Sequence, residues 1–204
     1  KYVKGAKKVL SVHGVFSDQV SGLHSSSVSS LAKAAELQVL KWSDRLTTDS
    51  KATQKMYKEK LGLDFEYLPS PIDTAKFANL PSIEKVPNQV AYLGRKSYEK
   101  RMDVLKKSEP QIKGKVVYCL DRSWQDAMLI MKSSDVVVVP SRMESLRTTI
   151  KEALFLKIPV VATNVGGIPE LIKNNETGFL VPSDDPQTVS YTHLRAHETR
   201  EDRG

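Results

Sequence analysis

Short segments rich in valine and isoleucine alternate with longer stretches of helical periodicity along most of this chain. The alternation favours parallel strands joined by helices that cover both faces of a sheet, because a parallel strand can follow another only through a crossover connection. We expect strands at residues 8–13, 44–48, 66–68, 89–94, 116–120, 135–140, 159–163 and 178–181. We expect helices at residues 22–41, 50–61, 100–107, 124–132, 145–157 and 169–173. The chain is therefore predicted to adopt an α/β fold.

A polar stretch near the middle of the chain has no clear periodicity. It reads KFANLPSIEKVPN, covers residues 76–88 and contains two prolines, a composition that is typical of a linker. We therefore predict one domain at residues 1–77, a linker at 78–88 and a second domain at 89–189. Residues 190–204 lose the apolar periodicity and alternate arginines with acids, so we interpret them as a non-native tail.

The composition excludes several classes of protein. Hydrophobic residues make up 40% and charged residues 27% of the 204, as in ordinary globular chains. Cys119 is the one cysteine and cannot form an internal disulfide, which fits the cytoplasm. The net charge of +7 leaves open nucleic acid, an anionic membrane surface or a phosphorylated small molecule as partner. Because the lysines are scattered and lack interleaved aromatic residues, we expect no nucleic acid.

Two glutamates, Glu144 and Glu152, have seven residues between them in a segment that also contains a predicted helix. The first turn of a helix has N–H groups without partners inside the helix, and these groups bind phosphate well. We expect the amides of Ser145, Leu146 and Arg147 to do so. Glu152 would lie about 12 Å further along the helix axis. The spacing leaves two alternatives: carboxylates that bind one ligand together, or two solvated glutamates on a surface helix.

The residues around these glutamates resemble the retaining glycosyltransferases of the GT-B fold, specifically family 4, or group 1. The family's pattern is a proline-serine strand end, E-x7-E, P-V-(V/I)-A-T, G-G-x-P-E and T-G-x-L-V. This chain matches it at Pro140, Ser141, Glu144, Glu152, 159–163, 166–170 and 177–181. The resemblance implies two Rossmann-like halves: the C-terminal part of an acceptor-side domain at residues 1–77 and a domain that binds the nucleotide-sugar donor at 89–189. Only one strand is expected between Gly94 and the strand that ends at Ser141, so the second half is predicted to lack about one βα unit.

The same resemblance implies roles for individual side chains. Arg95 and Lys100 would hold the donor diphosphate, whose charge grows as the glycosidic bond breaks, so cations favour the transition state. Glu144 would bind the hydroxyls of the donor sugar, and Glu152 the ribose. His13 would orient the transferred sugar. The remaining donor-binding residues are predicted to be Gly166 and Gly167, together with Ser145, Leu146 and Arg147.

The chain contains no Asp-x-Asp pair, and the resemblance implies a metal-free reaction without a cofactor. The expected function is transfer of a sugar, with retention, from a UDP- or GDP-sugar to a glycan or lipid-linked acceptor. The alternative is a non-catalytic remnant that still binds nucleotide-sugars. Two positions depart from the family, because Arg147 replaces a glycine or proline and Arg101 replaces a glycine. Arg147 would either crowd the phosphate or give it a further positive contact.

Overall fold

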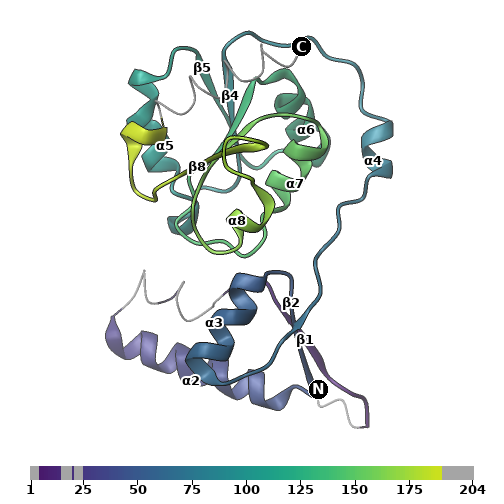
Figure 1. The fold of residues 1–204 in the computed structure, drawn as a ribbon, viewed down its shortest axis with the longest axis vertical. Coiled ribbons are helices and arrows are strands. Elements are labelled where there is room, and N and C mark those ends of the chain that lie inside the picture. The colour runs from purple at the N-terminus through teal and green to yellow at the C-terminus, as the bar shows by residue number, and fades with distance from the viewer. Residues whose placement is uncertain (1–4, 15–19, 21–24, 190–204) are drawn as a thin grey trace. The chain divides into compact units, whose positions relative to one another are not determined.

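The computed structural model describes residues 5–14, 20 and 25–189, and it divides the chain into two compact units. The units are Lys1–Ser70 and Pro71–Gly204 (Figure 1). Within the described part of the chain, no helix combines the length and the apolar character that a membrane span requires.

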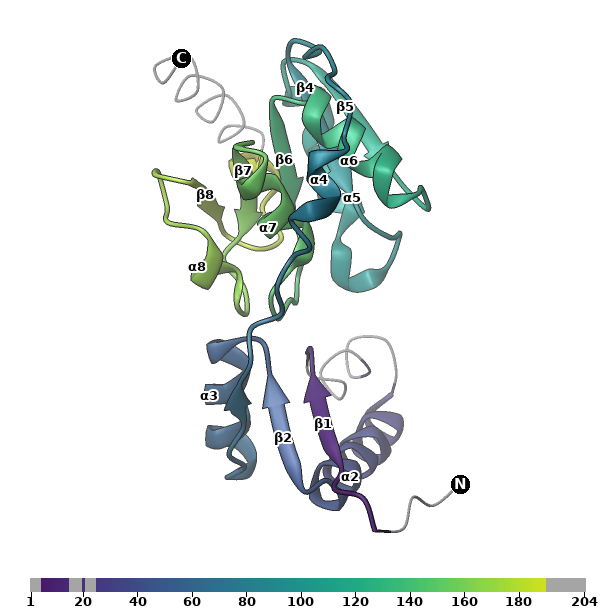
Figure 2. The same cartoon turned by 90° about the vertical axis from the view of Figure 1, so that its right-hand side faces the viewer.

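The first unit contains a parallel sheet in the order β1-β2-β3. Its elements are β1 (Val9–Val12), α2 (Ser26–Trp42), β2 (Arg45–Thr48), α3 (Lys51–Leu61) and β3 (Glu66–Tyr67). Both helices contribute to one small core, in which Leu40 of α2 and Tyr57 of α3 lie buried with Phe65. The rings of Tyr57 and Phe65 stack with centroids 4.6 Å apart. Figure 2 shows β1 and β2 side by side in this unit.

The ends of α3 are fixed by the residues that the sequence provides there. The Ser50 side chain accepts a hydrogen bond of 3.2 Å from the Thr53 amide, which caps the first turn. Gly62 follows the last turn with φ +66°, a left-handed conformation that glycine adopts at little cost.

The second unit contains a five-stranded parallel sheet in the order β5-β4-β6-β7-β8. Its strands are β4 (Gln89–Leu93), β5 (Lys115–Cys119), β6 (Val136–Val139), β7 (Val160–Thr163) and β8 (Gly178–Val181). Its helices are α4 (Ala75–Ala78), α5 (Met102–Ser108), α6 (Trp124–Ser133), α7 (Thr148–Phe155) and α8 (Ile168–Leu171), with 3-10 turns η1 (Tyr98–Lys100) and η2 (Glu109–Gln111).

Helices cover both faces of this sheet. Successive side chains of a strand point to opposite sides, so each strand contributes to two cores. Ala91 and Leu93 belong to a core that also contains residues of α6, α7 and α8. Val90 and Tyr92 belong to a second core with residues of α5. All four valines of β6 are buried, as expected of a central parallel strand. This unit is the doubly wound type predicted from the sequence.

The strand order reverses at β4, which lies between β5 and β6. The chain passes from β5 through α6 to β6, and the described residues between Cys119 and Val136 contain no further strand. Strand β5 is therefore an edge strand, and the predicted shortage of one βα unit is confirmed. In open α/β sheets, ligands bind outside the carboxyl ends of the strands at such a reversal point.

The predicted start of one helix is wrong. We expected a helix from residue 145, but α7 begins at Thr148, and residues 141–147 form a loop. The reason is a set of long-range contacts: Arg147 has an extended backbone, and its side chain binds Ser141 and the carbonyl oxygen of Leu93. These contacts keep residues 141–147 from adopting a helical backbone.

The segment before β4 also differs from an open linker. Phe77 packs against Trp124 and Phe155, with ring centroids 5.2 and 4.7 Å away. The Val86 amide donates a hydrogen bond of 2.8 Å to the Ser133 carbonyl oxygen. The boundary between the units follows Ser70, earlier than the end that we predicted for the first domain. The predicted non-native tail at 190–204 lies outside the described residues.

Candidate functional site

The carboxyl ends of β4, β6 and β7 bring several polar side chains to one edge of the second sheet. Gly94 and Arg95 follow β4, Ser141 lies two residues after β6, and Thr163 ends β7. Ser141 and Thr163 are fully buried, and the Thr163 hydroxyl donates a hydrogen bond to the Ser141 carbonyl oxygen. This bond fixes the start of the loop that carries Glu144.

Three donors converge on one carboxylate oxygen of that loop. The Oε1 atom of Glu144 lies 2.7 Å from Lys100 Nζ, 2.6 Å from Arg147 Nη1 and 2.7 Å from the Ser141 hydroxyl. The Glu144 side chain is only 9% exposed. The alternative of a solvated glutamate on a surface helix is therefore wrong for Glu144.

The electrostatics of this cluster favour the charged form of Glu144 and disfavour that of Lys100. Burial raises the pKa of Glu144, but Arg147 and Lys100 outweigh burial, so the pKa lies below its ordinary value. Burial, followed by repulsion from Arg147, lowers the pKa of Lys100, although Glu144 opposes this change. With two cations against one carboxylate, the cluster is net positive and suits an anion.

The glycine turn after β7 packs directly on the Glu144 backbone. A Cβ atom placed on Gly166 would lie 1.8 Å from the Glu144 carbonyl oxygen, and Gly166 has φ +53°. The Gly167 amide donates a hydrogen bond of 3.4 Å to the same oxygen. Only glycine fits at position 166, and this turn packs against the Glu144 loop. The predicted donor-binding role of Gly166 and Gly167 stays a prediction.

The second glutamate lies on α7 and is also buried. Glu152 Oε1 accepts a hydrogen bond of 2.8 Å from the indole Nε1 of Trp124. Burial raises the pKa of Glu152, and the bond from Trp124 opposes this only in part. The carboxyl group lines a cavity of about 310 Å³, whose other polar lining includes Arg95, Asp121, Arg122 and Thr149.

The other predicted residues differ in position. The Arg95 side chain is 77% exposed and lies 3.8 Å from Glu99, and Arg95 is one of the residues that line the cavity with Glu152. Ser145 and Leu146 are buried in the loop before α7, so their amides do not belong to the first helical turn. That part of the predicted phosphate site is wrong in its geometry, because the first helical residue is Thr148.

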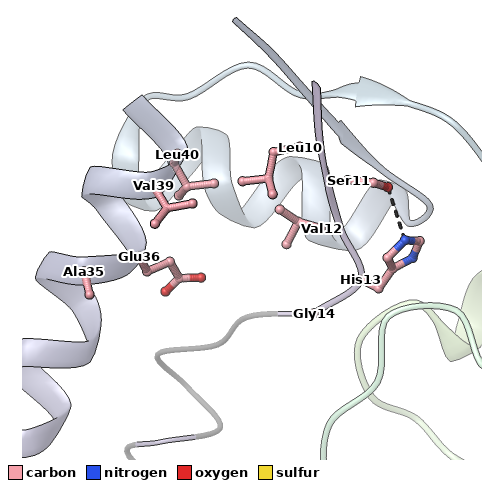
Figure 3. A pocket seen from close by; sticks show the side chains of 9 residues that line it. All are labelled: Leu10, Ser11, Val12, His13, Gly14, Ala35, Glu36, Val39 and Leu40. Carbon is pink, nitrogen blue, oxygen red and sulfur yellow. Dashed lines mark hydrogen bonds between the residues drawn. The ribbon is translucent and has the colours of Figure 1, made fainter. Parts of the chain in front are cut away.

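His13 belongs to the first unit. Its Nδ1 lies 3.1 Å from the buried carboxylate of Asp49, and its Nε2 lies 3.1 Å from the Ser11 hydroxyl (Figure 3). A carboxylate only accepts, so Nδ1 carries a proton. His13 also lines a cavity of about 350 Å³ together with apolar side chains of β1 and α2 (Figure 3). Its predicted role toward the transferred sugar stays a prediction.

Trp124 is a residue that sequence reasoning missed. It begins the helix after β5, so it lies beside the carboxyl end of a strand, and this position is the signal that would have found it. No group of three or more histidine, cysteine, aspartate or glutamate side chains that could hold a metal ion occurs in the described ranges.

Two Rossmann-like parallel units, one with a positive cluster at its strand reversal, define a protein of the GT-B type. A family described as "Glycosyl transferases group 1" matches residues 77–198. The chain belongs to the group 1 glycosyltransferases.

Two curated relatives illustrate the sequence similarity. Sulfoquinovosyl transferase SQD2 of Arabidopsis thaliana is 32% identical over 126 residues, which cover 58% of this chain and 24% of that protein. D-inositol 3-phosphate glycosyltransferase of Paenarthrobacter aurescens (strain TC1) is 43% identical over 77 residues, covering 36% and 19%. The chain thus spans about a quarter or less of the length of these relatives.

Solved structures share the fold at low identity. TarM of S. aureus superposes with a TM-score of 0.75 at 15% identity, covering 97% of this chain and 45% of that one. Anabaena Alr3699/HepE in complex with UDP-glucose gives a TM-score of 0.71 at 16% identity, covering 95% and 66%. These similarities establish the fold of the described residues.

Proposed function

We propose that this chain contains the donor-binding part of a retaining glycosyltransferase that moves a sugar from a UDP- or GDP-sugar to a glycan or lipid-linked acceptor. The observation that carries the proposal is the partly buried cluster in which Lys100 and Arg147 share the Glu144 carboxylate beside the Gly166 turn. A net positive, preorganised cluster at a strand reversal suits the diphosphate of a nucleotide-sugar.

In this proposal Lys100 binds the diphosphate, and Arg95 approaches it from the cavity that Glu152 lines. The C1–O bond to the diphosphate breaks, and the diphosphate gains negative charge that a nearby cation stabilises more in the transition state than in the ground state. No metal is needed for that task when cations already stand there. Support comes from the partial burial of Lys100, which strengthens its interaction with an anion.

The two glutamates would bind the two sugars that flank the diphosphate. Glu144 accepts hydrogen bonds from hydroxyls of the transferred sugar, and Glu152 accepts them from the ribose. Burial of both carboxylates supports these roles, because a buried carboxylate gains more from a hydroxyl donor than a solvated one. The cavity that Glu152 lines offers apolar and aromatic surface, including Trp124, for the base.

We infer retention from the family. The acceptor oxygen forms a bond to C1 on the face that the diphosphate leaves, and the departing diphosphate oxygen takes the acceptor proton. The base and sugar of a first probe follow from relatives, since a complex of Alr3699/HepE contains UDP-glucose and a complex of TarM contains UDP. A cytoplasmic location and a role in polysaccharide or glycolipid synthesis are part of the proposal. Contact with an anionic membrane surface has only the net charge of +7 in its favour.

Isothermal titration calorimetry with UDP, UDP-glucose, GDP and GDP-mannose tests the proposal. We expect saturable binding of one base series, with UMP or GMP bound more weakly than the corresponding diphosphate. Release of free sugar from the donor on the same sample separates a catalyst from a binding remnant, since the remnant would bind without turnover. No binding of any of these nucleotides would contradict the proposed function.

A further inference from the structure

Arg147 stands where the sequence pattern leads one to expect glycine or proline, and it is among the most buried charged side chains of its unit. The side chain is 7% exposed. Nη1 donates to Glu144 Oε1 at 2.6 Å and lies 3.1 Å from the Ser141 hydroxyl, while Nη2 donates to the Leu93 carbonyl oxygen at 2.5 Å. These contacts join the ends of two adjacent strands.

Both Nη atoms of the guanidinium are bound to protein acceptors, whereas Nε is buried and has no hydrogen-bond partner among the described residues. Three of the five N–H donors of an arginine are accounted for by protein acceptors. A Cβ atom on Gly94 would lie 2.5 Å from Nη2, so the side chain lies directly against the backbone after β4. Arg147 therefore neither crowds a phosphate from outside nor extends toward one as Lys100 can.

The Lys100 side chain is less constrained than the Arg147 side chain. It is 17% exposed and forms an ion pair with Glu144. The ammonium group sits on a flexible four-carbon stem and can rotate toward a new anion. If Lys100 were the only cation near Glu144, such a movement would leave a buried carboxylate unpaired, which is costly.

We propose that Arg147 is a positioning residue that keeps the Glu144 charge paired and thereby releases Lys100 to bind the donor diphosphate. The inference rests on the proposed function and deepens it. Without the donor, Glu144 pairs with both Lys100 and Arg147; with the donor bound, it pairs with Arg147 alone. Arg147 stays on Glu144, Ser141 and Leu93 throughout, and the carboxylate keeps its orientation toward the sugar.

The test is a double-mutant cycle read by UDP binding in a calorimeter. Arg147→Met should weaken UDP binding about tenfold or more, because Lys100 then remains bound to Glu144. Glu144→Gln should strengthen UDP binding, because Lys100 is released. In the Glu144→Gln background, the further change Arg147→Met should alter UDP affinity by less than about twofold, since no carboxylate is left to hold Lys100.

The opposite result identifies a direct contact. If Arg147→Met weakens UDP binding by the same factor in both backgrounds, Arg147 binds the phosphate itself and the inference is overturned. A folded Arg147→Met protein with unchanged UDP affinity overturns it as well. Wild-type chain that binds neither UDP nor GDP contradicts the proposed function instead, so the two failures are distinguishable.

Thermal unfolding of every variant checks that the variant is folded. Arg45→Met provides the matched control, because Arg45 is an exposed arginine of the first unit that pairs with Glu66, and its UDP affinity should equal that of wild type. If Arg147→Met does not fold, the variant that also carries Glu144→Gln removes both buried charges together. That variant must then bind UDP as tightly as Glu144→Gln alone, and weaker binding overturns the inference.

Discussion

Lys100 and Glu144 lie 44 residues apart in the chain and form a partly buried ion pair with 2.7 Å between Nζ and Oε1. One partner follows β4 and the other follows β6, so the pair connects the two strands at which the sheet order reverses. The proposed donor site is built around this connection, and its separate parts can be tested by substitution.

Replacing the lysine should remove diphosphate affinity. Lys100→Met is expected to weaken UDP binding at least about tenfold, and to affect UMP much less, because UMP lacks the second phosphate. Calorimetry with both nucleotides measures the difference. Lys107→Met is the control, since Lys107 is an exposed lysine of α5. An equal loss for UMP and UDP would show that Lys100 does not act on the diphosphate.

Glu152 should control recognition of the ribose. Wild-type chain is expected to bind UDP more tightly than 2′-deoxy-UDP, because one hydroxyl donor is lost in the second ligand. Glu152→Ala should reduce that preference to near unity, and Trp124→Phe, which removes the 2.8 Å hydrogen bond, should reduce it in part. A full preference in Glu152→Ala would place the ribose elsewhere.

Gly166 should tolerate no side chain. Gly166→Ala is expected to cost about 1–3 kcal/mol of the free energy of unfolding and to weaken UDP binding, because a Cβ collides with the Glu144 carbonyl oxygen at a left-handed φ. Gly62→Ala has a similar φ but open space around the new Cβ. It should cost about 1 kcal/mol and leave UDP affinity unchanged. Denaturation and calorimetry measure the two effects; equal UDP affinities for both variants would contradict the packing argument.

The free energy of unfolding should fall at acidic pH because Glu144 becomes protonated. Its pKa lies below the ordinary 4.5 in the folded chain, so the unfolded chain binds more protons as the pH falls through 4.5. The stabilisation by the ionised carboxylate is therefore present above 4.5 and lost toward the lower, folded pKa. Glu152 has the opposite sign, since its pKa is raised, so the difference between wild type and Glu144→Gln isolates the first group.

The urea-unfolding difference between wild type and Glu144→Gln should be about 1–3 kcal/mol at neutral pH and should shrink steadily below pH 4.5. Glu59→Gln, an exposed change on α3, should show no such trend. A difference that stays constant down to pH 3 would mean that the Glu144 charge contributes nothing to stability.

Most strands could be predicted because their residues carry the signal locally. The four valines of β6 and the run of β7 are buried on both faces, and a buried parallel strand has no polar alternation to confuse the pattern. The caps of α3 were equally local, since Ser50 and Gly62 act on their own helix.

The parts that could not be predicted depend on distant residues. The start of α7 is set by Arg147, whose guanidinium binds the Leu93 carbonyl oxygen 54 residues away. The orientation of Glu152 depends on Trp124, 28 residues earlier in the chain. Both contacts form only when the sheet has brought distant residues together, so they cannot be predicted from a local sequence pattern.

One departure from the family has a local explanation. Arg101 replaces the expected glycine and has φ +48°, a left-handed conformation that favours glycine. Its guanidinium binds Asp103 through two hydrogen bonds of 2.9 Å and pairs with Asp184. These contacts offset part of the backbone cost and fix the turn that presents Lys100.

A crystal structure of the chain with UDP would show whether the proposed donor site binds the nucleotide. We predict the diphosphate at hydrogen-bonding distance from Lys100 Nζ, the ribose against Glu152, and Arg147 still bound to Glu144. UDP bound away from these residues, with Lys100 still paired to Glu144, would contradict this prediction.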